Sequence, residues 1–213
     1  EDNLDGIISD NRLGVYNKKR PSVFVSHQLN VLSGKTTWFS SKMHQKIIKK
    51  FDECWVPDNR NVHNLSGKLG HINSISISPK YIGPISRFVK KDLPIKYQIM
   101  VLLSGPEPQR SLLEKKLITE LQSYSGNVLF VKGVVESSIK STIENHITFY
   151  NYMTSDLLEN AINESELIIS RSGYTTIMDL AKLGKRAFFI PTPGQYEQEY
   201  LAKVLCENKL FPS

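Results

Sequence analysis

The sequence predicts an α/β fold with parallel sheets, and three observations support this class. Short apolar runs bounded by turn residues alternate with segments of helical period along most of the chain. Near the middle, two prolines and a glycine in the stretch 77–88 interrupt this alternation. With 213 residues, the chain can bury one large core or two small ones. We therefore expect two domains, residues 1–80 and 89–213, joined by residues 81–88.

The predicted elements follow from these runs in chain order. In the first part we predict strands at Gly6–Ser9, Ser22–Ser26 and Glu53–Val56, and a helix over roughly Ser40–Lys50. The second part alternates more cleanly, with a polar loop before its third strand. Its predicted strands are Tyr97–Leu103, Asn127–Val131, Ile147–Phe149, Leu167–Ser170 and Ala187–Ile190. Its predicted helices are Gln109–Tyr124, Thr154–Ile162, Gly173–Leu183 and Tyr196–Cys206.

Composition is that of an ordinary globular protein. Hydrophobic residues make up 40% and charged residues 23%, and no apolar run approaches the 18 residues that a membrane-spanning helix needs. The two cysteines, Cys54 and Cys206, are expected to be reduced and packed as small apolar groups. The net charge of +6 is compatible with nucleic acid, an anionic bilayer surface or a phosphate-bearing ligand, and equally with a solvated basic face.

The segment 167–183 carries the clearest indication of a binding site. An apolar run, Leu167–Ile169, leads through Ser170–Gly173 into a predicted helix. Helix N-termini that follow the carboxyl ends of parallel strands hold anions, so Ser172 and Gly173 occupy a phosphate-binding position. Hydroxyl groups of Ser172, Thr175 and Thr176 would add donors, and Asp179, two turns further on, could accept from ribose hydroxyls. The alternative is that the hydroxyls only cap the helix and Asp179 is a solvated helix residue.

Polar side chains also follow the next predicted strand. Residues 191–195 form a stiff loop, after which Gln195, Glu197, Gln198 and Glu199 begin the last predicted helix. Amides and carboxylates at such a position suit a polyhydroxylated ligand. They are also compatible with a polar first turn in which acidic residues interact favourably with the helix dipole.

The string SRSGYTTIMDLAKLGKRAFFIPTPGQYEQEYLAKVL resembles the donor-domain signature of glycosyltransferase family 28. FYNYMTSDLLENAINESELIISRSG looks like the uracil-contacting loop and following helix of that family. YIGPISRF is similar to its interdomain entry, and VFVSHQLN to the end of its N-terminal domain. The resemblance implies a GT-B fold: residues 1–80 would be the last part of an N-terminal acceptor domain, and 89–213 a Rossmann-like donor domain. Because the chain lacks an initial Met, we expect a piece of a longer protein.

The same resemblance assigns roles to single residues. It implies that the backbone of Tyr150 reads uracil, that Asp179 holds ribose and that Arg87 contacts phosphate. Gln198 and Glu199 match the pair that grips the donor sugar, although Glu199 stands where the typical pattern has Gln. Ser104 and Gly105 stand in a loop that is glycine-rich in the family but here reads Ser-Gly-Pro-Glu-Pro-Gln. The predicted donor-binding set is Arg87, Ser104, Gly105, Tyr150, Ser172, Gly173, Thr175, Asp179, Gln195, Gln198 and Glu199.

The implied activity is transfer of a hexosyl group, with N-acetylglucosaminyl expected, from a UDP-sugar to an acceptor hydroxyl with inversion, in cell-envelope or polysaccharide synthesis. No cofactor and no metal are expected, since the sequence shows no clustered Asp or His ligand set. The family's general base is a histidine of a glycine-rich N-terminal loop that this sequence does not contain. His27 is the local candidate, with an acceptor-site or structural role as the alternative.

Two other functions remain open. A UDP-N-acetylglucosamine 2-epimerase type isomerase shares the fold and would epimerise the donor without an acceptor. A non-catalytic donor-binding module would need a partner subunit for transfer. We expect no nucleic-acid partner and a cytoplasmic location, with peripheral docking of the basic residues before Lys50 on an anionic membrane. The acceptor stays open among lipid-linked sugars, lipopolysaccharide, capsule and small metabolites.

Overall fold

The computed structural model describes residues 4–31, 37–61, 63–72 and 78–212, with side chains omitted for 37–39. The chain divides into two compact units, residues 1–85 and 86–213, and the division falls inside the stretch 81–88. Each unit contains its own largely parallel sheet with helices connecting the strands. The predicted α/β class is therefore confirmed.

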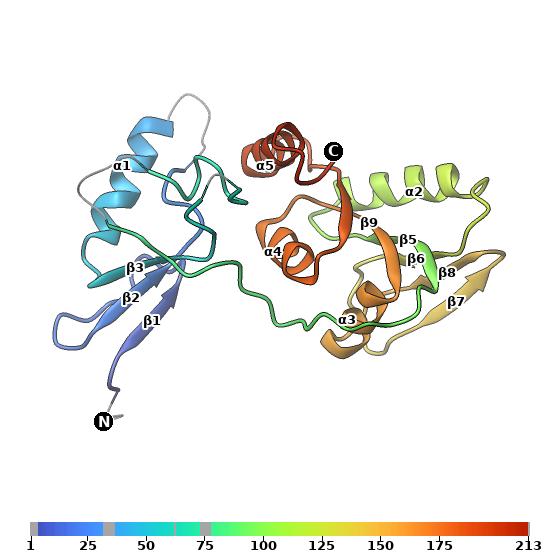
Figure 1. Cartoon of the computed structure of the whole chain (residues 1–213), viewed down its shortest axis with the longest axis horizontal. Helices are drawn as coiled ribbons and strands as arrows, with labels where there is room; N and C mark the ends of the chain where they lie inside the picture. Colours follow the sequence, from blue (N-terminus) through green and yellow to red (C-terminus); the bar gives the residue numbers. More distant parts are fainter. Residues whose placement is uncertain (1–3, 32–36, 62, 73–77, 213) are drawn as a thin grey trace. The chain divides into compact units, whose positions relative to one another are not determined.

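The first unit is built on a four-stranded parallel sheet whose spatial order follows the chain, β1-β2-β3-β4. Figure 1 labels the first three of these strands, which lie side by side. Its elements are β1 (Ile7–Asp10), β2 (Ser22–Val25), α1 (Thr37–Ile48), β3 (Glu53–Val56) and β4 (Lys80–Tyr81). Side chains of β2 and β3 alternate between buried and half-buried, so the inner face packs against α1. The core cluster is Phe24, Leu29, Ile48, Phe51, Cys54 and Val56.

The second unit holds a six-stranded sheet in the order β10-β9-β5-β6-β8-β7, parallel except for β7. Figure 1 shows helices α2 and α3 on opposite sides of this sheet, the arrangement of a doubly wound fold. Its strands are β5 (Tyr97–Leu102), β6 (Val128–Val131), β7 (Ser141–Glu144), β8 (Ile147–Tyr150), β9 (Ser165–Ser170) and β10 (Arg186–Phe189). Its helices are α2 (Gln109–Leu121), α3 (Ser155–Asn163), α4 (Tyr174–Leu183) and α5 (Tyr196–Glu207).

The core of the second unit lies where α2 packs on the middle of the sheet. All four residues of β6 are buried, as expected of a parallel strand covered on both faces. The cluster comprises Val101, Leu103, Leu117, Leu121, Val128, Phe130, Ile147 and Phe149. This core fixes the carboxyl ends of the strands, from which the turns of the candidate site emerge.

Two strands were not predicted. Strand β7 falls in the predicted polar loop, and all its residues are exposed because it is an edge strand with no buried face to leave an apolar alternation. It forms a hairpin with β8 through Asn145 and His146, and Asn145 adopts a positive φ of 54°. Strand β4 has only two residues, too few for a pattern.

Smaller differences concern element ends and one cysteine. β1 lies one residue later than predicted, and α2 ends at Leu121 rather than Tyr124. Both cysteines are free thiols, but only Cys54 is packed inside; Cys206 is exposed, against expectation. Burial raises the pKa of Cys54 to about 11, so this thiol stays protonated and unreactive near neutral pH.

Candidate functional site

In the second unit, the order in which the chain adds strands to the sheet reverses between the neighbouring strands β5 and β9. From β5 the chain adds β6 and β8 on one side, and from β9 it adds β10 on the other. In open parallel sheets, ligands bind at such a switch point, outside the carboxyl ends of the strands. The turns and helix starts at these ends carry most of the predicted site residues, namely Ser104, Gly105, Ser172, Gly173, Thr175, Gln195, Gln198 and Glu199.

Arg171, which follows β9 directly, fastens three of these segments together. Its guanidinium donates to the carbonyl oxygens of Ile190 at 3.2 Å and Pro191 at 2.8 Å, and to that of Gln109 at 2.8 Å. The side chain is buried, and this burial lowers the pKa of Arg171. The sequence prediction did not include Arg171. The sequence feature that could have pointed to Arg171 is an arginine placed directly after a buried strand. A buried guanidinium at such a position needs hydrogen-bond acceptors nearby.

The N-terminus of α4 is open on the side of its N-cap. Gly173 is the N-cap, and no side chain caps the helix, so the alternative that hydroxyl groups only cap it is not found. A Cβ atom at Gly173 would meet nothing within 4 Å. Thr175 in the first turn is exposed, whereas the buried hydroxyl of Ser172 donates to the backbone oxygen of Gln198 at 2.8 Å. The backbone and Thr175 are therefore available to an anion, and the Ser172 hydroxyl is already used.

Asp179 is buried rather than solvated. Only 9% of it is exposed, and its Oδ1 accepts a hydrogen bond from the hydroxyl of Ser86 at 2.5 Å. Burial raises the pKa of Asp179, while the Ser86 hydrogen bond and the charge of Arg87 oppose that rise. A carboxylate in this setting needs hydrogen-bond donors, which ligand hydroxyl groups can supply.

Arg87 belongs to the segment that enters the second unit. It is exposed, and its guanidinium lies 4.9 Å from the centre of the Phe88 ring. Its charge lowers the pKa of Asp179, so the two groups are within electrostatic reach of each other. The neighbouring Ser86 was not among the predicted residues; it is 93 positions away from Asp179, and no local pattern reveals such a pair.

The loop after β10 is braced by the side chains that were predicted to bind sugar. Gln198 accepts the backbone N–H of Thr192 at 2.9 Å and donates to the side-chain oxygen of Gln195 at 2.6 Å. Glu199 accepts the N–H of Gly194 at 2.8 Å. These hydrogen bonds fix the conformation of the loop. A ligand would bind to the donors and acceptors of these side chains that the bonds leave free. The hydroxyl of Thr192 is buried and has no partner within the described part of the chain.

The remaining predicted residues lie at the ends of β5 and β8. Ser104 is exposed, and Gly105 has a positive φ of 107°, a conformation that side chains disfavour. A Cβ atom at Gly105 would lie 3.8 Å from the Thr192 hydroxyl, so the two loops approach closely. The carbonyl of Tyr150 accepts the N–H of Lys132 at 2.9 Å within the sheet, so this backbone acceptor is shared with a strand partner.

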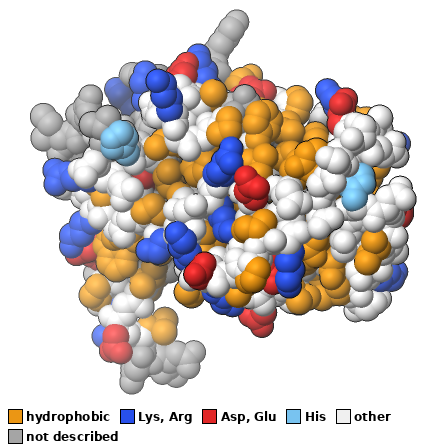
Figure 2. Space-filling model, turned by 45° about the vertical axis from the view of Figure 1, so that its right-hand side comes forward, with side chains coloured by type: hydrophobic (Ala, Val, Ile, Leu, Met, Phe, Trp, Pro, Cys, Tyr) orange, Lys and Arg blue, Asp and Glu red, His pale blue; other side chains and the backbone are white. Residues whose placement is uncertain are grey.

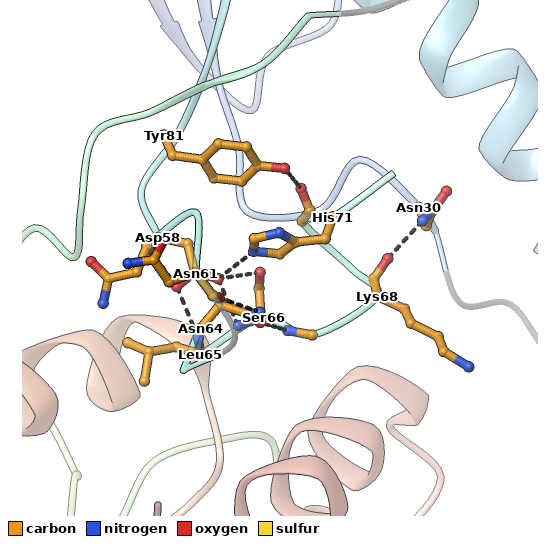
Figure 3. A network of polar contacts seen from close by, with 12 residues as sticks. Asn30, Asp58, Asn61, Asn64, Leu65, Ser66, Lys68, His71 and Tyr81 are labelled. Carbon is orange, nitrogen blue, oxygen red and sulfur yellow. Dashed lines mark hydrogen bonds and ion pairs between the residues drawn. The ribbon is translucent and has the colours of Figure 1, made fainter. Parts of the chain in front are cut away.

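His27 lies in the first unit, half-buried in the segment after β2. The most developed polar network of that unit is centred elsewhere, on Asp58 (Figure 3), which the sequence prediction did not include. The carboxylate of Asp58 is fully buried and accepts the backbone N–H groups of Leu65 and Ser66 at 2.8 Å each. The Ser66 hydroxyl also donates to it, and a ring nitrogen of His71 lies 3.4 Å away. With these donors the carboxylate fixes the backbone at Leu65 and Ser66.

Three surface and composition features bear on ligands and membranes. Within the described ranges, no group of three or more His, Cys, Asp or Glu side chains is arranged to hold a metal ion. Across the same ranges, no helix is both long and apolar enough to cross a membrane. On the face drawn in Figure 2, Lys and Arg side chains lie among acidic and hydrophobic ones.

One family model matches the part of the chain that carries most of these features. Residues 108–210 match the model of the glycosyltransferase family 28 C-terminal domain. This segment runs from the start of α2 to the end of α5 and includes the Arg171 turn, Asp179 and the loop braced by Gln198.

Curated relatives extend the similarity into the first unit. Two are named "UDP-N-acetylglucosamine--N-acetylmuramyl-(pentapeptide) pyrophosphoryl-undecaprenol N-acetylglucosamine transferase". The protein from Haemophilus ducreyi is 20% identical over 188 residues, which cover 86% of this chain and 50% of that protein. The protein from Buchnera aphidicola is 25% identical over 190 residues, covering 87% and 50% respectively. The chain thus spans about half the length of the curated relatives it matches.

Solved structures show the same fold. MurG of Acinetobacter baumannii superposes with a TM-score of 0.55 at 16% identity, over 91% of this chain and 52% of that one. The glycosyltransferase of kitacinnamycin superposes with a TM-score of 0.61 at 11% identity, over 100% and 63%. The expected similarity to GT-B glycosyltransferases is therefore confirmed for the fold. Residues 108–210 thus match the glycosyltransferase family 28 C-terminal domain, and the chain has a GT-B-like fold.

Proposed function

We propose that the second unit binds the UDP-sugar donor of a glycosyltransferase, and that the protein to which this chain belongs transfers an N-acetylglucosaminyl group to an acceptor hydroxyl. The observation that carries the proposal is the buried Asp179 on α4, less than two turns beyond the uncapped N-terminus at the sheet's switch point. An anion site and a hydroxyl-accepting carboxylate on one helix suit a nucleoside diphosphate.

The diphosphate would be neutralised by groups of this chain alone. The N–H groups at the start of α4 carry the positive end of the helix dipole, and Arg87 adds a full charge close to Asp179. Thr175 and Ser104 are exposed and can donate from the two facing turns. In this proposal no metal takes part, and the leaving UDP is stabilised by these donors.

The proposed reaction is a direct displacement with inversion. An acceptor oxygen forms a bond to the anomeric carbon while the bond from that carbon to the UDP oxygen breaks and UDP leaves with the electron pair. The proton of the acceptor hydroxyl passes to a general base. We assign no residue of this chain to that base; His27 remains a candidate only by its place in the sequence. The acceptor is proposed to be lipid-linked, with the enzyme at the cytoplasmic face of a membrane.

Calorimetric titration of UDP into the 213-residue chain tests the proposal, with UMP and ADP as comparison ligands. UDP should bind more tightly than ADP, and Asp179→Ala should weaken UDP by roughly 1–3 kcal/mol because ribose hydroxyls lose their acceptor. Asp156→Ala, which removes an exposed carboxylate from the first turn of α3, is the matched control. Equal affinity for UDP and ADP, or an unaffected Asp179→Ala chain, would count against the proposal.

A further inference from the structure

The hydroxyl of Ser86 has a defined direction. It accepts the backbone N–H of Phe88 at 3.0 Å and gives its own proton to Oδ1 of Asp179 at 2.5 Å. Since a serine hydroxyl has a single hydrogen, this proton has no other use. The Ser86 hydroxyl is therefore a donor to Asp179 and an acceptor for Phe88, and these two roles fix its orientation.

The segment that carries Ser86 is fastened to α3. The N–H of Val89 donates to the carboxylate of Glu159 at 2.8 Å, and the N–H of Lys91 donates to the side-chain oxygen of Asn163 at 2.9 Å. Asn163 returns a hydrogen bond to the carbonyl of Val89 at 3.0 Å. Phe88 is itself buried. Ser86 is thus presented to Asp179 by an anchored segment.

Only one of the two carboxylate oxygens of Asp179 is held in this way. Among the described residues, Ser86 is the hydrogen-bond donor to the carboxylate, and it occupies Oδ1. The other oxygen, Oδ2, is left to accept from a ligand. Because burial works against the charged form of Asp179, the Ser86 bond also helps to keep the carboxylate ionised.

We propose that Ser86 is a positioning residue for the nucleotide: its hydroxyl fixes the orientation of the Asp179 carboxylate, so that the acceptor sites that remain on it face the ribose hydroxyls. This inference rests on the proposed function and adds to it a residue that touches no substrate.

The test is calorimetric titration of UDP into the parent chain, Ser86→Ala and Ser86→Thr at about pH 8 and about pH 5.5. Without the Ser86 bond the pKa of Asp179 rises further, so Ser86→Ala should lose affinity at both pH values and lose more at the acidic one. Ser86→Thr keeps a hydroxyl and should restore most of the affinity. Ser123→Ala, at an exposed serine beyond α2, is the matched control, and thermal melting of each variant checks that it is folded.

The outcomes separate the two levels of the proposal. If the folded parent chain does not bind UDP, the proposed function fails and this inference fails with it. If the parent binds UDP and Ser86→Ala binds it equally well at both pH values, the donor site stands and the positioning role of Ser86 is refuted.

Discussion

The hydroxyl of Ser172 donates to the backbone oxygen of Gln198 at 2.8 Å and so joins the turn after β9 to the first turn of α5. Ser172 is fully buried. Its role in this structure is to hold two site-bearing turns in register, while the backbone beside it remains open for a ligand. Ser172, whose hydroxyl the sequence analysis expected to donate to an anion, instead donates to the backbone of α5 and supports the site in this way.

Replacing Ser172 by Ala should therefore lower the stability of the second unit. The change removes one buried hydrogen bond and leaves a carbonyl without this donor, which costs about 1–2 kcal/mol. Urea denaturation followed by circular dichroism measures the loss. Ser138→Ala, at an exposed serine, should change the stability by less than about 0.5 kcal/mol. A Ser172→Ala chain as stable as the parent would show that the bond contributes nothing.

Arg171→Lys should be more damaging than its charge conservation suggests. A single ammonium group cannot reach the carbonyls of Gln109, Ile190 and Pro191 together, so buried acceptors lose their donors. We expect a loss of about 2–4 kcal/mol. The control is Arg186→Lys, whose side chain is 76% exposed and pairs with Glu166 at the surface. Equal melting temperatures for the two variants would contradict the bracing role of Arg171.

The sequence analysis predicted features that depend on residues close together in the chain, and it missed those that depend on residues far apart. Strand β6 and helix α4 were predicted to within one residue because burial on both faces and strong helical periodicity leave local patterns. The position of Asp179 relative to Gly173 follows from helix geometry alone. Its burial does not, because that depends on Ser86, which approaches from a segment 93 residues earlier.

The same reasoning explains why the sequence did not reveal the bracing role of the predicted sugar-binding group. Gln195 and Gln198 have the chemistry to grip hydroxyls, and that chemistry also closes their own loop. Residue type alone cannot separate these uses, because a side-chain amide pairs equally well with a ligand or with a neighbouring backbone. Edge strand β7 was missed for a related reason: a strand exposed on both faces has the composition of a loop.

UDP binding should not depend on divalent metal ions. The proposed phosphate donors are the start of α4 and Arg87, which bring their own positive charge. Calorimetry of UDP in the presence of EDTA and then of excess Mg²⁺ should give affinities that agree within about twofold, a difference of about 0.4 kcal/mol. A strong gain with Mg²⁺ would indicate that a metal bridges the diphosphate and these donors.

The first unit should bind anionic membranes through α1. Lys42 and Lys46 on this helix and Lys49 just after its end are exposed, and each basic residue near an anionic surface contributes about 1 kcal/mol. The chain should co-sediment with vesicles that contain phosphatidylserine. Changing these three lysines to Gln should leave most of it in the supernatant. Changing Lys115, Lys116 and Lys203, also exposed, removes the same charge from the second unit and serves as the control. Equal release by both triple variants would argue against a site on α1.

Asp179→Asn should stabilise the chain near neutral pH. Burial raises the pKa of Asp179, so the folded state holds its proton more tightly than the unfolded state does. The resulting stability is complete below the unfolded pKa of about 4 and is lost as the pH rises through the folded value. Asn never ionises and keeps an acceptor for Ser86, so it avoids this loss.

The advantage of Asp179→Asn over the parent should therefore be largest at about pH 8 and shrink toward about pH 4, in urea denaturation at each pH. Asp156→Asn, at an exposed helix position, should show no such trend. A variant that is less stable than the parent at about pH 8 would contradict the argument. If the variant is more stable and also binds UDP more weakly, the ionised carboxylate is kept for binding at the expense of the fold, as is common at functional sites.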